Sequence, residues 1–248
     1  MPKVSPDTTA QGASQFTRTH WSVVLLAAQT PSPEAQAALE KLCETYWYPL
    51  YAYLRRQGSA PADAQDLTQE FFARFLEKNF LAKVHPTKGK FRSFLLAALK
   101  HFTANEWDRV KAEKRGGKHT FISLDEQSAE DRYAFEPVAE LGAEGVYEQR
   151  WALTVLDQAL LRLREDYAAA AKSAQFEELK QFLSSEAAPG VYAGLGSRLQ
   201  MAPGAVAVAV HRLRQRYGEC LRAEIAETLS DPEDVDDEMR HLFSIINH

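Results

Sequence analysis

The sequence predicts an all-α protein with two helical domains. Apolar residues recur at intervals of three or four along most of the chain, and no stretch alternates as a strand would. This period is lost over residues 116–146, where acidic side chains greatly outnumber basic ones, as expected of a linker. The 248 residues are enough for two small domains, each with its own core.

Charge and hydropathy exclude some classes of function. A formal net charge of −5 argues against a protein that coats nucleic acid without discrimination. Basic residues gather at 100–118 and 212–222, so any DNA contact depends on local patches. No apolar run approaches the ~20 residues of a membrane span, and residues 1–15 lack the form of a secretory signal. We therefore expect a cytoplasmic protein without membrane contact and with a disordered segment at 1–15.

We expect no catalytic, metal or cofactor site. Cys43 and Cys220 lie far apart within helical apolar patterns, which is typical of buried free thiols. The chain has no glycine-rich phosphate loop and no nucleophile elbow, so an all-helical hydrolase is disfavoured and we expect no enzyme.

The first predicted domain covers residues 16–115. Its helices are expected at about 17–29, 33–57, 63–78 and 91–114, with a loop around His85, Pro86 and Gly89 before the last of them. The inner stripe of the second helix is Leu39, Leu42, Tyr46, Leu50 and Leu54.

The second predicted domain covers residues 147–229 and is followed by a C-terminal extension at 230–248. The dipeptide Asp231-Pro232 is a strong start signal for a helix in this extension. The apolar residues of that helix are Val235, Met239, Leu242 and Ile246.

Two surfaces of the first domain are candidates for function. On the helix at 63–78, Asp66, Glu70, Arg74 and Glu77 lie opposite the apolar side, and the alternative is an ordinary solvated face. On the helix at 91–114, one side carries Lys100, Thr103, Trp107, Lys111 and Lys114. Cations hold phosphates and a flat ring stacks on an unpaired base, so this side suits melted nucleic acid. An ordinary basic helix whose Trp107 packs against another segment is equally compatible.

The third candidate is a helix-turn-helix at 191–217, with its turn at 200–202. The second helix would bury Val206, Val210, Leu213, Tyr217 and Leu221. Such a helix can enter the major groove, with outward side chains at base edges and arginines on phosphates. The outward residues are Val208, His211, Arg212 and Gln215, flanked by Arg198, Arg214 and Arg216. The alternative is a helical hairpin with a basic rim.

These segments resemble the extracytoplasmic-function sigma factors of bacterial RNA polymerase over nearly the whole chain. Residues 63–77, 90–96 and 105–109 are similar to sigma region two, and residues 201–217 are similar to the recognition helix of region four. The resemblance implies that core RNA polymerase and promoter DNA are the partners, and an anti-sigma factor is a common further partner in the family.

The resemblance also implies roles for particular residues. Asp66, Gln69, Glu70 and Arg74 would dock on the coiled-coil clamp of the largest polymerase subunit. The melted minus-ten element would contact Arg92, Lys100, Trp107, Lys111 and Lys114. The helix at 203–217 would read the minus-thirty-five duplex, and the acidic linker would thread polymerase channels.

The second motif departs from the family at five positions. Gly194 and Gly196 stand where helix formers are usual, which predicts a frayed first helix. Gln200 replaces the usual turn glycine, Ala202 replaces the usual Ser or Thr cap, and Ala207 replaces a frequent basic residue.

Two hypotheses about function and control remain open from the sequence. A helix-turn-helix regulator acting as a dimer without polymerase would need an apolar face, which the C-terminal helix could supply. That helix also suggests self-control in place of an anti-sigma factor.

Overall fold

The computed structural model describes residues 33–76, 90–112, 129–130, 132–133, 141–229 and 231–247. All regular secondary structure in these ranges is helical, which confirms the all-α prediction. The helix expected at 17–29 and most of the expected linker lie outside these ranges.

Three helices make up the first half of the described chain: α2 (Pro33–Arg56), α3 (Pro61–Leu76) and α5 (Phe91–Ala112). Gly58 ends α2 because it adopts a left-handed conformation with φ of 97°. The amide of Ser59 then donates to the carbonyl of Leu54 at 3.1 Å, as in a Schellman cap. Pro61 follows at the first position of α3, where its missing N–H costs nothing.

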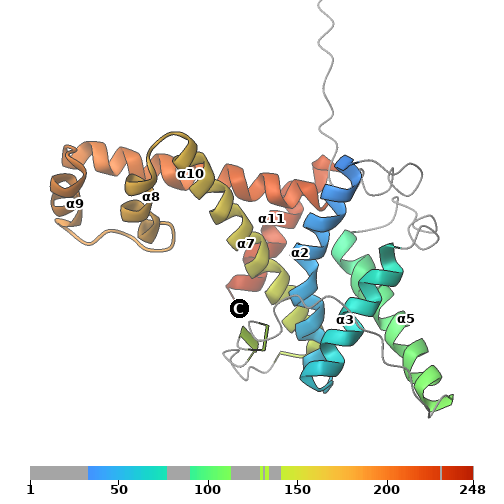
Figure 1. Cartoon of the computed structure of the whole chain (residues 1–248). Coiled ribbons are helices and arrows are strands. Elements are labelled where there is room, and N and C mark those ends of the chain that lie inside the picture. Colours follow the sequence, from blue (N-terminus) through green and yellow to red (C-terminus); the bar gives the residue numbers. More distant parts are fainter. Residues whose placement is uncertain are drawn as a thin grey trace, which may run out of the picture.

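The second half contains two long helices, α7 (Ala143–Ala169) and α10 (Pro203–Glu227), packed against each other. Between them come the short helices α8 (Ser173–Leu179), η1 (Lys180–Phe182) and α9 (Val191–Leu199). The chain continues into η2 (Pro232–Asp234) and α11 (Val235–Ile246). Helices α8 and α9 lie at one end of the molecule, and α3 and α5 lie at the other (Figure 1).

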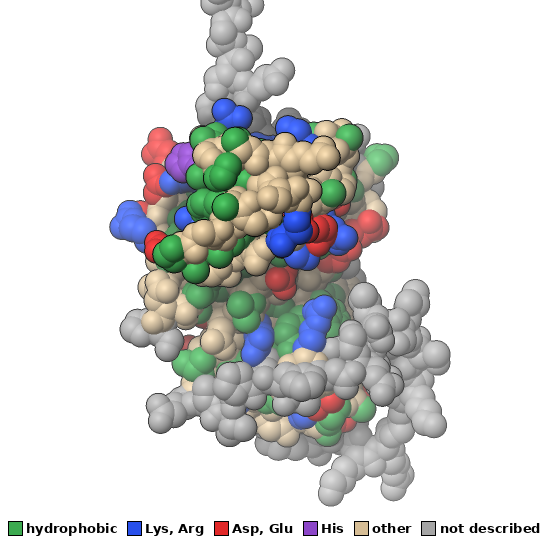
Figure 2. Space-filling model, turned by 90° about the vertical axis from the view of Figure 1, so that its left-hand side faces the viewer, with side chains coloured by type: hydrophobic (Ala, Val, Ile, Leu, Met, Phe, Trp, Pro, Cys, Tyr) green, Lys and Arg blue, Asp and Glu red, His purple; other side chains and the backbone are tan. Residues whose placement is uncertain are grey.

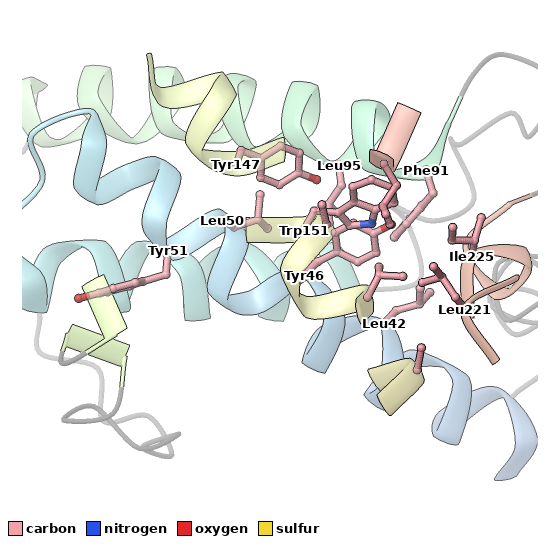
Figure 3. Close-up of a cluster of buried hydrophobic side chains, with 14 of the residues drawn as sticks. Leu42, Tyr46, Leu50, Tyr51, Phe91, Leu95, Tyr147, Trp151, Leu221 and Ile225 are labelled. Atoms are coloured by element: carbon pink, nitrogen blue, oxygen red, sulfur yellow. The ribbon is translucent and has the colours of Figure 1, made fainter. Parts of the chain in front are cut away.

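The buried side chains of both halves form one hydrophobic cluster. Tyr46 of α2 and Trp151 of α7 are completely or almost completely buried and lie side by side (Figure 3). The ring of Phe91 from α5 meets that of Tyr46 edge-on, with centroids 5.1 Å apart. Leu221 and Ile225 bring α10 into the same cluster. Large aromatic side chains dominate core energetics, so α2 and α7 depend on each other for burial.

Polar contacts also join the two halves. Glu224 of α10 is buried, and its carboxylate lies 2.8 Å from the ammonium of Lys41 on α2 and 3.2 Å from the guanidinium of Arg162 on α7. The amide of Gln158 donates to the hydroxyl of Thr45 at 2.9 Å. A buried carboxylate needs such partners, so Glu224 fixes how the three helices align.

Residues 129–130 and 132–133, within the expected linker, are helical and lie against α2. The Glu130 carboxylate accepts hydrogen bonds from the hydroxyl of Tyr51 at 2.5 Å and from the guanidinium of Arg55 at 2.7 Å. Arg55, and to a smaller extent Tyr51, hold the pKa of Glu130 below its ordinary value.

Candidate nucleic-acid interface

A tight connection sets the position of α10 relative to α9. Gln200 adopts a left-handed conformation with φ of 54°, and the amide of Met201 donates to the carbonyl of Gly196 at 2.8 Å. Gly196 is buried, and a Cβ atom there would lie 2.5 Å from the carbonyl oxygen of Met201. The turn after α9 can therefore fold back this tightly only with glycine at 196, and α9 is helical in spite of its two glycines.

The first turn of α10 begins without a side-chain cap. Ala202 has an extended backbone (φ −63°, ψ 146°), and its carbonyl accepts the first helical hydrogen bond, from the amide of Val206 at 3.1 Å. Pro203 occupies the first helical position, where its ring fixes φ in advance. The backbone is thus in the geometry of a capped helix, while alanine offers no oxygen to the free N–H groups.

The first half of α10 separates buried from exposed residues at helical spacing. Val206, Val210 and Leu213 are buried. Val208 is 50 % exposed, and His211, Arg212 and Gln215 are exposed as well. An exposed helix face with an apolar residue between polar and cationic ones is the kind of face that reads base edges.

The arginines near this face differ in their partners. Arg214 donates to the carbonyls of Phe182 and Ser185, each at 2.8 Å, and so holds the segment after η1. Arg216 lies 2.8 Å from both Asp166 and Glu219.

Arg198 and Arg212 differ in whether a carboxylate pairs with them. The guanidinium of Arg198 lies 2.8 Å from Glu178. No carboxylate within the described ranges pairs with Arg212, which makes Arg212 the cation of this face with the least internal competition for a phosphate.

A groove of about 790 Å³ runs beside this face, between the end of α7, α8 and the start of α10. Tyr167, Met201 and Val208 give it apolar lining, while Lys172 and Arg212 add positive charge. Apolar and basic side chains are interspersed with acidic ones on this end of the molecule (Figure 2). The groove continues the exposed face of α10.

On α5 the structure places only part of the expected basic stripe. Lys100 is partly exposed and pairs with Glu144 of α7, whose hydrogen bond raises the pKa of the lysine. Trp107 and Lys111 fall within α5, but their side chains lie outside the described part of the molecule, as does Lys114.

Arg92 is not on a DNA-accessible surface in this structure, contrary to our expectation. Its side chain is 5 % exposed, lies 2.9 Å from Glu148 of α7 and pairs with Glu238 of α11. The guanidinium also stacks over the ring of Trp151 at 4.6 Å. The guanidinium that we expected to contact DNA is thus in contact with two carboxylates and an aromatic ring.

Part of the charged face of α3 is engaged within the molecule, and Glu77 lies outside the described residues. Arg74 lies 2.5 Å from Glu70 on the same helix and 2.7 Å from Glu106 on α5, and it sits over the ring of Phe102. Asp66 is exposed, and Gln69 is half-buried. A protein that docks here would meet a face whose arginine is already paired.

No cluster of His, Cys, Asp or Glu that could hold a metal ion is found among the described residues. Over the same residues, no helix combines the length and apolar character needed to cross a membrane. Both cysteines are free thiols, and burial raises the pKa of Cys43 to about 12.

The chain was compared with models of protein families, with curated proteins and with solved structures. None of them matches.

Our sequence reasoning missed the buried carboxylates of Glu224 and Glu238. A signal for both was present, because each lies in the apolar stripe of its helix. Glu238 stands between Val235 and Leu242, and Glu224 stands between Leu221 and Ile225. An acidic residue on the inner face of an amphipathic helix indicates a buried cationic partner.

Proposed function

We propose that this protein is a sigma factor that binds core RNA polymerase and directs promoter recognition and transcription initiation. The observation that carries the proposal is the exposed face of α10, where Val208, His211 and Arg212 point away from the core beside a tight turn from α9. The sequence resemblance to sigma regions two and four, in the right order along the chain, supports it.

In this proposal α9 and α10 act as a helix-turn-helix. The major groove of B-DNA admits one α-helix, so α10 would enter it with its first half. Val208 would contact a thymine methyl group, while Arg212 would bind a guanine edge or a phosphate. This unit would be the second of two DNA-reading domains.

The first domain would supply the polymerase contact and the minus-ten contact. The exposed carboxylate of Asp66, and that of Glu70 once it leaves Arg74, would face a basic surface of the polymerase. The last turns of α5, with Trp107 and Lys111, would bind the melted strand, because unpaired bases stack on aromatic rings.

Run-off transcription with core polymerase and a promoter library tests the proposal. We expect Trp107→Ala with Lys111→Ala to abolish promoter opening and to spare polymerase binding. Glu70→Lys should instead weaken polymerase binding, and promoter opening falls with it because opening requires the bound polymerase. Glu70→Gln removes the same carboxylate and the same ion pair with Arg74 without reversing the charge, so it should weaken polymerase binding less than Glu70→Lys does. Equal loss of polymerase affinity in all three variants would contradict the division of labour.

A dimeric regulator that acts without polymerase is the second candidate. Phe243 and Ile246 on α11 are 47 % and 39 % exposed, which leaves an apolar strip for a partner. Leu242 is fully buried within the molecule, so the strip is narrower than the sequence predicted. A stable dimer in gel filtration that does not bind core polymerase would favour this candidate and exclude the sigma-factor proposal.

A further inference from the structure

Helix α11 covers the start of α5 with a buried ion pair. Glu238 is 1 % exposed, and its carboxylate lies 2.5 Å from the ammonium of Lys90 and also pairs with the guanidinium of Arg92. These two cations flank Phe91, the first residue of α5. A single carboxylate of α11 therefore contacts both cations at this end of the helix.

A second contact ties α11 to the same cluster through α7. Nε2 of His241, one turn after Glu238, lies 3.1 Å from the carboxylate of Glu148. Glu148 in turn lies 2.9 Å from Arg92. The cluster joins α5, α7 and α11, and the hydroxyl of Tyr147 closes it by donating to the carbonyl of Arg92 at 2.9 Å.

Helix α11 combines this polar cluster with a small apolar contact, in which Val235, Met239 and Ile245 are only partly buried against the core. Leu242 is its one fully buried apolar residue, while Phe243 and Ile246 are exposed. In a buried ion pair, the attraction between the two charges is roughly offset by the cost of removing both from water. Such pairs therefore fix the orientation of a helix but add little net free energy to its attachment. The elements that move in a protein are those with few buried apolar contacts. Helix α11 is short and has a single fully buried apolar side chain, so it is a candidate for such movement.

We propose that α11 is an intramolecular competitor of DNA, whose Glu238 carboxylate occupies the Lys90–Arg92 cation pair in place of a nucleic-acid phosphate. A phosphate is an anion that Arg and Lys bind as they bind a carboxylate. While α11 is docked, Glu238 holds both cations; when α11 leaves, Lys90 loses this carboxylate and Arg92 keeps only Glu148 of α7, so the start of α5 gains one uncompensated positive charge for a phosphate. The inference rests on the proposed function only in taking DNA as the competitor.

The test uses the full chain and a labelled single-stranded oligonucleotide as the probe. Glu238→Gln removes the charge that faces Lys90 and Arg92. Asp237→Asn removes the same charge one position earlier, from an exposed residue whose only partner among the described residues is Arg240 on its own helix. We expect Glu238→Gln to bind the oligonucleotide about tenfold more tightly than the wild type and Asp237→Asn to stay within twofold of it, since each further cation that reaches a phosphate strengthens binding. Adding Lys90→Gln to Glu238→Gln should remove part of this increase in affinity.

Amide hydrogen exchange in the same samples reports whether α11 is released. We expect the amides of α11 in Glu238→Gln to exchange at least about tenfold faster, with α2 and α7 still protected. Faster exchange in α11 without tighter binding overturns the proposal, and so does unchanged exchange. An equally large increase in affinity in Asp237→Asn assigns the effect to net charge and overturns it as well.

If Glu238→Gln loses protection from exchange throughout the chain, the whole fold is destabilised, and Leu242→Ala then provides the test. This variant loosens α11 without leaving a charge unpaired, because Leu242 is the buried apolar contact of the helix. It should show the same faster exchange in α11 and the same tighter binding, and release without tighter binding overturns the proposal. The sigma-factor proposal is tested separately, since it fails if the wild type and the released variants all ignore core polymerase, whatever they do with the oligonucleotide.

Discussion

Gly196 and Gly194 sit two residues apart on α9 and have opposite roles. At Gly196 a methyl group would strike the carbonyl of Met201, while at Gly194 nothing lies within 4 Å of the added carbon. We expect Gly196→Ala to lower the free energy of unfolding by about 1–3 kcal/mol, the usual cost of overpacking against a fixed group. Gly194→Ala should raise it by about 0.5–1 kcal/mol, because alanine is the better helix former.

Urea denaturation of the two variants measures both changes. Comparing these two variants shows whether each glycine is structurally required. The structure gives a steric reason for Gly196 and none for Gly194. Equal effects of the two substitutions would contradict the close contact between Gly196 and the turn at Met201.

The carboxyl of Glu130 predicts a pH dependence of stability. Its pKa in the folded protein lies below the ordinary value of about 4.5 because Arg55 and Tyr51 bind the charged form. A depressed folded pKa stabilises the protein above the unfolded pKa, and this stabilisation is lost as the pH falls through the folded value. Glu130→Gln should therefore cost about 1 kcal/mol at pH 7, a modest figure because the pair is partly exposed, and progressively less below about pH 4.5.

Urea denaturation at pH 7 and in steps down to about pH 3 checks this dependence. Glu186→Gln is the control, because Glu186 is exposed and none of the described cations pairs with it. If the difference in stability between wild type and Glu130→Gln stayed constant over this range, the charged form of Glu130 would not be what holds residues 129–130 and 132–133 against α2.

At the scale of the element, the two arginines of α10 should respond differently to substitution. Arg212 is exposed and no described carboxylate pairs with it, while Arg216 is bound to Asp166 and Glu219. An arginine that contacts a phosphate contributes about one unit to the slope of log affinity against log salt. We expect Arg212→Ala to reduce that slope for duplex DNA by about 1 and Arg216→Ala to change it less.

Fluorescence anisotropy of a labelled duplex at several salt concentrations provides the slopes. Because both substitutions remove one positive charge from the same helix, net charge affects them alike. If the two slopes fell equally, the internal ion pairs of Arg216 would not affect DNA binding. The DNA contact would then not be confined to the first half of α10.

The helices and their buried faces were largely predictable from the sequence. The ion-pair partners of the buried charged side chains were not. Apolar spacing alone identifies Val206, Val210 and Leu213 as buried, because the period of a helix is a local property. The left-handed Gln200 and the uncapped Ala202 occupy positions where turn and cap residues were expected.

Arg92 shows where this reasoning stops. Its neighbours Phe91 and Leu95 are apolar, but which carboxylates neutralise it depends on Glu148 and Glu238, which lie 56 and 146 positions away. Pairings at such separations are set by the tertiary fold, and neither periodicity nor family resemblance specifies them. The same holds for Glu224 with Lys41 and Arg162.

At the scale of the whole molecule, the shared core predicts that the two halves unfold together. Leu50 of α2 is fully buried in the cluster that contains Trp151 and Tyr147 of α7. Leu50→Ala should lower the free energy of unfolding by about 2–5 kcal/mol, as for other buried leucines. If the halves form one cooperative unit, α7 and α10 lose stability by the same amount as α2 and α5.

Hydrogen exchange resolved by helix measures this coupling, because the slowest amides of each helix report its global opening. Leu161→Ala is the matched control, since Leu161 of α7 is 57 % exposed and its removal leaves no cavity. We expect it to change exchange little anywhere. Faster exchange in α2 and α5 alone would instead show two domains that unfold independently, which is the organisation expected from the acidic segment at 116–146. In that case the contacts of Glu224 and Glu238 would be features of a docked state, and their disruption would separate the halves without unfolding either one.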